Sequence, residues 1–462
     1  MDLITKFYEA VFYGFTNPKP SPVIGKVLGT VVALLLLCLI IYYTTATVIQ
    51  YSSLDPRTAD TNVVIEMKNR VAELDLIDAS GLNLVRYDGQ KSLYNDLLKT
   101  ININQQYLVN LCPLTAAIGG YLGPLRDGVF NGTYYVKRAL RAGIRSFVLP
   151  ISTYYDDNKM PPNWPKSRKP AIVCRDNDGV ILGLNGFSVG QFCKALIEHK
   201  SINIAQKDEP ILIYLDGVPN HIPNMTSAEK EYVQFMSDIA SELTLLEPYR
   251  LTTLKNYGSA VGGKIQDKIL TQVMLEDFKN KILIYTNFNV DVETKGAYAA
   301  VTPKLYNYVN FIYKPISAAT ISTEVPSGSR CIRILDVSGS QVDWTSQART
   351  SWHVTLLDPI INIPDAKMVD FVTKTGIHGV PIPFLFYDSK AKQSKAVQAQ
   401  VANISEMYKQ WNGYAWRMKP EAARYTKPAE VTPLTPSTKL NARVDNSLQP
   451  GQHYFQSREV LS

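Results

Sequence analysis

Short apolar runs alternate with helical stretches from Gln106 to about residue 425, and this alternation restricts the chain to few folds. The runs have the length and the β-branched and aromatic content of buried strands. Strands that alternate with helices form parallel sheets, and eight such units close into a (β/α)8 TIM barrel of the α/β class. The predicted strands are Tyr107–Leu111, Ser146–Ile151, Ala171–Cys174, Ile211–Leu215, Ile282–Thr286, Val309–Tyr313, Val354–Leu357 and Pro381–Phe386.

Amphipathic stretches predict the helices of this barrel. They are Val136–Ala142, Val189–His199, Ser227–Glu247 and Ala391–Gln410. The pattern over Ile321–Trp344 favours a hairpin insertion instead. We therefore assign residues 106–425 to one barrel domain.

A second constraint is the apolar run Val27–Ile49, which has 23 residues and no charge. At ~1.5 Å per residue, such a helix spans a hydrocarbon layer of ~30 Å. Lys6, Lys19 and Lys26 precede it, whereas only Arg57 follows closely. The run predicts a single-pass membrane protein. The charge bias predicts a cytoplasmic N-terminus, with the large domain on the other side of the membrane.

The remaining segments flank these two features. Residues 1–22 include apolar side chains at three- to four-residue spacing, which suit a helix in the membrane surface or one docked on the globular domain. Residues 50–105 are interpreted as a stalk or cap. The proline-containing tail, residues 426–462, is predicted to be extended or disordered until it meets a partner.

Composition excludes several classes of function. The net charge of +7 is spread along 462 residues without a Lys/Arg block, so we expect no nucleic-acid partner. The five cysteines show no C-x-x-C spacing, which argues against a zinc site and favours buried free thiols, with a disulfide open only in an oxidising compartment. We expect no cofactor.

Six segments, in order along the chain, carry a family resemblance. Together they resemble the barrel of phosphoinositide-specific phospholipase C over about residues 106–425. The Leu111–Ala117 stretch, LCPLTAA, is similar to degenerate barrels of large DNA viruses, which suggests a viral inner membrane as the location. The six segments are YYVKRALRAGIRSFVL from Tyr134, PAIVCR from Pro170, PILIYLD from Pro210, KILIYT from Lys281, GVPIPFLF from Gly379 and GYAWRMKPEAAR from Gly413.

The resemblance implies a general base and a general acid, both histidines, after the first and third strands. The first position falls on Cys112, Pro113 or Leu114 and the second near Arg175. None is a histidine, and the first histidine of the chain is His199. Because this chemistry requires an imidazole that titrates near neutral pH, we expect no catalytic residues.

The calcium ligands that the resemblance implies are also incomplete. The acidic pair that ends strand two falls on Val148 and Pro150, and the strand-four acid is Asp216. The inositol-phosphate lysines after strand five are replaced by the segment Asn287–Asn289. One acid of the set remains, so no metal is expected.

Other candidates are weaker. Asp176–Gly179 resembles the opening of a calcium loop but lacks its terminal glutamate, so a turn is favoured. Asn131, Asn224 and Asn403 begin N-x-S/T sequons and are glycosylation acceptors if the domain enters a secretory lumen.

Three functions stay open at this point. The first is a membrane-anchored pseudoenzyme, a scaffold that binds the bilayer and a protein partner through its barrel or tail. The second is a phosphoric diester hydrolase whose rearranged site uses Asp216, Arg175 and His221. The third is a lipid-headgroup binder. The fold alone does not choose among them.

Overall fold

The structure is a computed structural model that describes the following residues of the chain. These are residues 32, 34–44, 56–79, 91–123, 127–153, 169–175, 180–218, 222–253, 265, 270–312, 314–315, 330–333, 337, 342–356, 370, 373–382, 384–385 and 411–427.

Eight parallel strand positions form a closed ring. β2, β5, β7, β8 and β9 pair in this order, and β10, β11 and β12 form a second parallel run. β9 and β10 are separated only by residue 313, so they occupy one position. Val354 of β12 bridges Gly379 just before β13, and β13 pairs with β2. Their bounds are β2 Thr115–Ala116, β5 Ser146–Thr153, β7 Ile211–Gly217, β8 Ile282–Thr286, β9 Phe311–Ile312, β10 Lys314–Pro315, β11 Arg330–Arg333, β12 His353–Leu356 and β13 Pro381–Ile382.

The ring contains the predicted number of strands, but two members differ from the prediction. The predicted third strand corresponds to β6 (Pro170–Ile172), which pairs antiparallel with the end of β5 and lies outside the ring. Its place in the count is taken by β11, which falls within the predicted hairpin insertion but pairs parallel with β10 and β12. The hairpin prediction is therefore wrong for these residues.

The first strand also lies later in the chain than predicted. Tyr107–Leu111 is largely a 3-10 turn, and β1 (Leu111–Pro113) pairs antiparallel with β14 (Trp416–Met418). The ring strand is β2, which begins at Thr115. β1 and β14 thus join the two ends of the domain and are not part of the ring.

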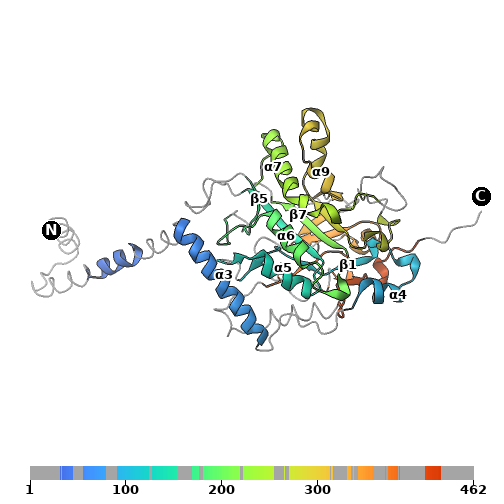
Figure 1. Ribbon diagram of the computed structural model, residues 1–462, viewed down its shortest axis with the longest axis horizontal. Coiled ribbons are helices and arrows are strands. Elements are labelled where there is room, and N and C mark those ends of the chain that lie inside the picture. The colour runs from blue at the N-terminus through green and yellow to red at the C-terminus, as the bar shows by residue number, and fades with distance from the viewer. Residues whose placement is uncertain are drawn as a thin grey trace, which may run out of the picture. The chain divides into compact units, whose positions relative to one another are not determined.

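Three long helices cover one side of the ring (Figure 1). α5 (Gly132–Arg141) is capped by Asn131, and α6 (Val189–His199) begins with a capping box between Ser188 and Gln191. α7 (Glu229–Glu242) continues into a 3-10 helix, η5. α5 contacts α6, and α6 contacts α7.

The remaining elements are short. They are β3 (Tyr121–Leu122) paired with β4 (Val129–Phe130), α4 (Leu98–Thr100), α9 (Leu305–Tyr308), α12 (Trp344–Gln347), the π-helical turn η1 (Leu93–Leu97), and the 3-10 helices η2 (Ile103–Gln105), η3 (Leu108–Asn110), η4 (Ile204–Gln206), η5 (Leu243–Tyr249), η7 (Leu275–Phe278), η8 (Val290–Thr294), η9 (Gly296–Ala300) and η11 (Glu421–Ala423).

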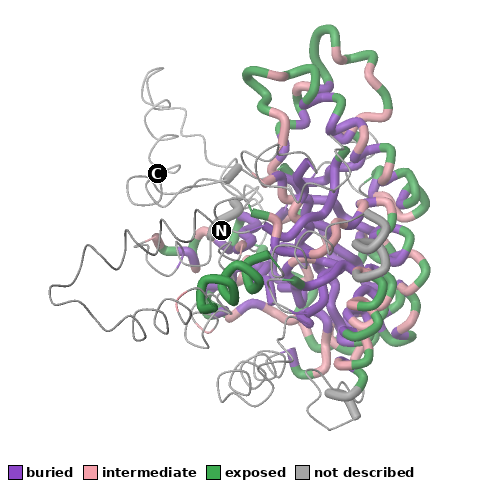
Figure 2. The backbone as a smooth tube through the Cα atoms, turned by 90° about the vertical axis from the view of Figure 1, so that its left-hand side faces the viewer, coloured by how far each residue is buried: buried purple, intermediate pink, exposed green. Residues whose placement is uncertain are grey.

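Side-chain alternation along the strands builds two cores. Phe147, Ile213 and Ile284 belong to the cluster that packs against α5, α6 and α7. Their neighbours Val148 and Tyr214 belong to a second cluster inside the ring. Figure 2 shows that buried residues run through the middle of the domain and that exposed residues lie toward its outside.

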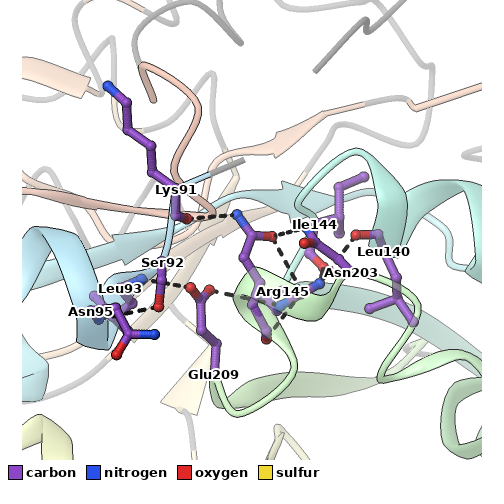
Figure 3. A network of polar contacts seen from close by, with 10 residues as sticks. Lys91, Ser92, Leu93, Asn95, Leu140, Ile144, Arg145, Asn203 and Glu209 are labelled. Atoms are coloured by element: carbon purple, nitrogen blue, oxygen red, sulfur yellow. Dashed lines mark hydrogen bonds and ion pairs between the residues drawn. The ribbon is translucent and has the colours of Figure 1, made fainter. Parts of the chain in front are cut away.

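A buried ion pair closes the end of the ring at which the strands begin. Arg145 and Glu209 are 0% and 1% exposed, with Nε and Oε2 3.8 Å apart. The Arg145 guanidinium also donates to the carbonyl of Ile144 at 2.9 Å and to Gln206, while Glu209 accepts the Leu93 N–H at 2.7 Å (Figure 3). These bonds attach the chain around Leu93 to two barrel loops.

α3 (Pro56–Ala79) lies in the segment interpreted as a stalk or cap, and its second half packs on the barrel domain. Leu74 is fully buried in the cluster between the ring and the helices α5, α6 and α7, here called the outer core, and Met67 and Val71 pack against this cluster. The Tyr134 hydroxyl donates to Asp75 at 2.9 Å. This part of the 50–105 segment therefore covers the domain.

The predicted membrane run is described only in part. Residues 34–44 form a helix whose large apolar side chains are 44–71% exposed, and the rest of Val27–Ile49 except residue 32 lies outside the described residues. None of the described helices has both the length and the apolar character needed to cross a bilayer.

Several other predictions fall outside the described residues. These are the segment 1–22, the turn 176–179, His221, the helix Ala391–Gln410, Asn403 and residues 428–462 of the tail. Residues 426–462 form a unit separate from residues 1–425.

Candidate functional site

The carboxyl ends of parallel barrel strands surround the usual site of a TIM-barrel protein, here called the barrel mouth. The mouth residue after the first strand β2 is set by where that strand ends. Ala117 and Ile118 follow β2, and Ile118 has a positive φ of 41°. The predicted positions Cys112 and Pro113 lie instead in β1, and Leu114 precedes β2; all of these residues are buried or nearly so. None of them offers an imidazole at the mouth.

Aromatic rings fill the barrel just below the mouth. Val148, Tyr214, Tyr285 and Phe311 are register partners on four successive strands, and each is at most 6% exposed. The Tyr285 ring lies 4.5 Å from that of Phe311 and 5.9 Å from that of Trp352. Burial raises the pKa of the Tyr285 phenol far above its ordinary value, so this hydroxyl does not act as a base.

One carboxylate stands above this layer. Asp216 lies near the end of β7, opposite Pro150 of β5, and is partly exposed. The Asn287 side chain donates from Nδ2 to Asp216 Oδ1 at 2.9 Å, and its Oδ1 accepts the Gly217 N–H at 2.7 Å. Asn287 therefore bridges the ends of β7 and β8 and orients the carboxylate.

Gly217 is required for this arrangement. A Cβ atom there would lie 2.9 Å from the ring of Phe288, which is itself buried in the outer core. Phe288 and Asn287, both at the lysine positions that the resemblance implies, thus pack and brace the strand ends. Neither carries a charge that would attract a phosphate.

Arg175 is held at the end of β5. It is 8% exposed, its Nε donates to Ser152 Oγ at 3.2 Å, and its Nη2 donates to the Thr153 carbonyl at 2.9 Å. Ser152 lies two residues beyond Pro150, the register partner of Asp216. The buried guanidinium thus fixes the end of β5.

The described histidines lie away from the mouth. His199 ends α6, while His353 and His378 are buried where the strands β12 and β13 begin. The His378 Nε2 donates to the Val109 carbonyl at 2.8 Å, and its Nδ1 accepts the His353 N–H at 3.2 Å. Burial, with Lys419 nearby, holds the pKa of His378 well below its usual value, so the ring is neutral and structural.

Lys419 is the other unusual group at this closed end. It is fully buried and donates to the Ala348 carbonyl. Burial lowers its pKa from 10.5 to about 7, against a smaller opposing effect of Cys112. Burial likewise raises the pKa of the Cys112 thiol, although Arg417 and Lys419 oppose the shift. A buried thiol of raised pKa is a poor nucleophile.

Among the described residues, no group of three His, Cys, Asp or Glu side chains is placed to hold a metal ion. Cys112, Cys174 and Cys193 are buried. The sequence did not reveal that Asn287 binds Asp216, because nothing local links two residues 71 positions apart.

Comparison with known proteins gives a likeness of fold. No family model and no characterised protein matches this sequence. The crystal structure of L. pealei PLC21 has a TM-score of 0.46 at 13% identity, over 72% of this chain and 39% of that chain. A Ca²⁺-dependent phosphatidylinositol-specific phospholipase C from Streptomyces antibioticus has a TM-score of 0.35 at 10% identity, over 60% of this chain and 94% of that one. A glycerophosphodiester phosphodiesterase from Parabacteroides distasonis has a TM-score of 0.28 at 9% identity, over 63% and 98%.

The chain spans well under half of the PLC21 chains, 39% of the one from L. pealei and 38% of the one from S. officinalis.

Proposed function

We propose that this chain is a phospholipase C-like barrel that has lost catalysis and works as a membrane-anchored binding or scaffold protein. One observation carries the proposal. Among the described residues at the positions that the family resemblance assigns to chemistry, Asp216 is the one carboxylate and none is a histidine, while Arg175 is bonded to Ser152 and Thr153. The counterpart positions hold Ala117, Ile118 and Pro150.

This composition does not support phosphodiester cleavage. The reaction needs a base to take a proton from the attacking hydroxyl and an acid to protonate the leaving oxygen. Each such group contributes typically about 10²–10⁴-fold to the rate. A single carboxylate braced by Asn287 can serve in one role at most, and the aromatic layer beneath it offers no second group.

A hydrolase with a rearranged site is the competing function. It would need Arg175 to contact the phosphate, yet this guanidinium is 8% exposed and bonded to Ser152 and Thr153. Freeing it would break these hydrogen bonds and the packing at the end of β5. This arrangement favours the binding role.

The membrane part of the proposal rests on the apolar run Val27–Ile49 and on the exposed apolar side chains of residues 34–44. Apolar side chains of this kind are unfavourable in water and are covered by lipid or protein. We extend the proposal to a protein partner contacted by the tail, because its aromatic and apolar residues Tyr454, Phe455, Val460 and Leu461 occur in an otherwise polar segment.

The enzymatic part is tested with the full-length chain in lipid–detergent micelles that contain phosphatidylinositol and its phosphates, with and without calcium. We expect no release of inositol phosphates by the native chain or by Asp216→Asn. Calcium-dependent turnover that Asp216→Asn abolishes, and that Asp75→Asn leaves intact, would overturn the proposal in favour of the hydrolase.

The membrane part is tested by alkaline carbonate extraction of the full chain beside a chain that begins at Pro56. We expect the full chain to stay in the pellet and the shortened chain to be released. Equal release of both chains contradicts the anchor.

A further inference from the structure

The two sequons that the structure describes have opposite surroundings. Asn131, Gly132 and Thr133 form the start of α5. Asn224, Met225 and Thr226 lie in the loop between β7 and α7, and all three are exposed. An N-linked glycan needs the asparagine Nδ2 and the space beyond it to face solvent.

Asn131 contacts both α5 and α3 of the folded domain. Its Oδ1 accepts the Tyr134 N–H at 3.2 Å as the cap of α5, and its side chain borders a groove formed with Val64, Met67 and Val71 of α3. The neighbouring Gly132 is buried so closely that a Cβ atom would lie 1.8 Å from the Phe187 ring. Asn131 is half-buried, so a sugar attached to it would be crowded by α3 and by the buried start of α5.

Asn224 makes hydrogen bonds of the same kind, but its side chain is exposed. Its Oδ1 accepts the backbone N–H groups of Thr226 at 2.8 Å and Ser227 at 3.3 Å. Because the carboxamide is planar and its oxygen is turned to the backbone, the Nδ2 is directed away from it. A sugar there meets solvent and breaks neither of these bonds.

We infer that Asn224 is an N-glycosylation site of the folded protein and that Asn131 is not. This inference rests on the proposed function in one respect, the placement of the barrel domain on the non-cytoplasmic side. In the reaction, the Asn224 Nδ2 forms a bond to the anomeric carbon of a lipid-diphosphate-linked oligosaccharide. The bond from that carbon to the diphosphate oxygen breaks, the lipid diphosphate leaves, and the amide loses one proton.

The glycan would stand beside the barrel mouth. Asn224 follows β7, the strand that carries Asp216, and its neighbour Met225 accepts from Asn289 of the β8 loop at 3.1 Å. A bulky, hydrated chain at this rim opposes close contact between the mouth and a lipid surface. The inference therefore links the modification to a barrel that does not approach its own membrane mouth-first.

The test expresses the full chain with Asn403→Gln in cells with a secretory pathway, together with a reporter sequon added after Ser462. Peptide-N-glycosidase treatment, with the mobility of the chain as readout, reports each glycan. We expect two glycans on this background. Asn224→Gln and Thr226→Ala should each remove one, and Asn131→Gln and Thr133→Ala should remove none.

The outcomes separate the inference from its premise. If the reporter is modified while Asn224 is not, or if Asn131→Gln removes a glycan and Asn224→Gln does not, the inference is overturned and the placement of the domain stands. If neither the reporter nor Asn224 is modified, the placement fails together with the inference. Agreement between Thr226→Ala and Asn224→Gln excludes misfolding of one variant as the cause.

Discussion

The Asn287 side chain donates a 2.9 Å hydrogen bond to the Asp216 carboxylate, across the ends of two neighbouring barrel strands. The same amide also accepts the Gly217 N–H and donates to the Gly217 carbonyl at 3.2 Å. Asn287 thus uses its donor and acceptor capacity to hold one acid at the barrel mouth. Its role in this structure is to fix the rim.

Asn287→Asp should destabilise the protein, because it replaces the donor to Asp216 with a second carboxylate. Loss of a partly buried hydrogen bond costs about 1–3 kcal/mol, and like charges at this distance add to it. The free energy of unfolding, measured with urea at pH 7, should fall by about this amount. The loss should shrink near pH 4, where carboxyl groups begin to protonate.

The exposed Asn289 provides the matched control for this change. Asn289→Asp should alter the free energy of unfolding by less than Asn287→Asp at both pH values. Equal effects of the two variants would show that the bridge to Asp216 contributes nothing specific.

Trp352→Ala should be among the most damaging single changes in the domain. Trp352 is 1% exposed and lies between Tyr285 and His378, with a ring distance of 3.9 Å to the latter. Truncation of a buried aromatic side chain leaves a cavity and costs about 3–5 kcal/mol. Thermal unfolding should report this loss, and Trp352→Phe should lose less stability than Trp352→Ala. A Trp352→Ala variant with unchanged thermal stability would contradict a filled barrel interior.

Glu209 should make the stability of the protein depend on pH. Burial raises its pKa from 4.5 to about 7, and the opposing effect of Arg145 is smaller. Between these values the native protein binds a proton that the unfolded chain does not, so stability falls as pH rises through this window. The unfolding free energy of the native chain, minus that of Glu209→Gln, should therefore decrease from pH 4.5 to pH 7. A difference that is flat or rises over this range contradicts the assignment.

Lys419 should have its effect in a different pH range. Burial lowers its pKa from 10.5 to about 7, so between these values the unfolded chain binds a proton that the native protein does not. Stability attributable to this group therefore rises with pH over the window. The unfolding free energy of Lys419→Met, minus that of the native chain, should therefore be larger at pH 6 than at pH 9, as measured by urea unfolding. The opposite order would show that the buried amine stays charged.

Much of the barrel could be predicted from the sequence. β8 begins and ends where the apolar run Ile282–Thr286 does, and α6 occupies the predicted Val189–His199. These elements are long, periodic and buried on both faces or on one, so local patterns are enough to define them. The absence of any histidine before His199 is likewise a property of the chain alone.

The tertiary structure decided which strands belong to the ring. Pro170–Ile172 and Arg330–Arg333 are both short and extended, yet the first pairs antiparallel outside the ring and the second pairs parallel within it. β2 has two residues, too few to show any periodicity, and is recognised only by its partners β5 and β13. Pairing is made by hydrogen bonds to residues distant in the chain, and local sequence carries no record of that choice.

The same reason governs the site. The sequence determined that the chain lacks the acid–base histidines before residue 199 and keeps Asp216. Only the tertiary structure placed Asn287 against that acid, moved the first mouth position from Cys112–Leu114 to Ala117 and Ile118, and bound Arg175 to the end of β5. A residue's type is local, whereas what its side chain touches depends on the closure of the ring.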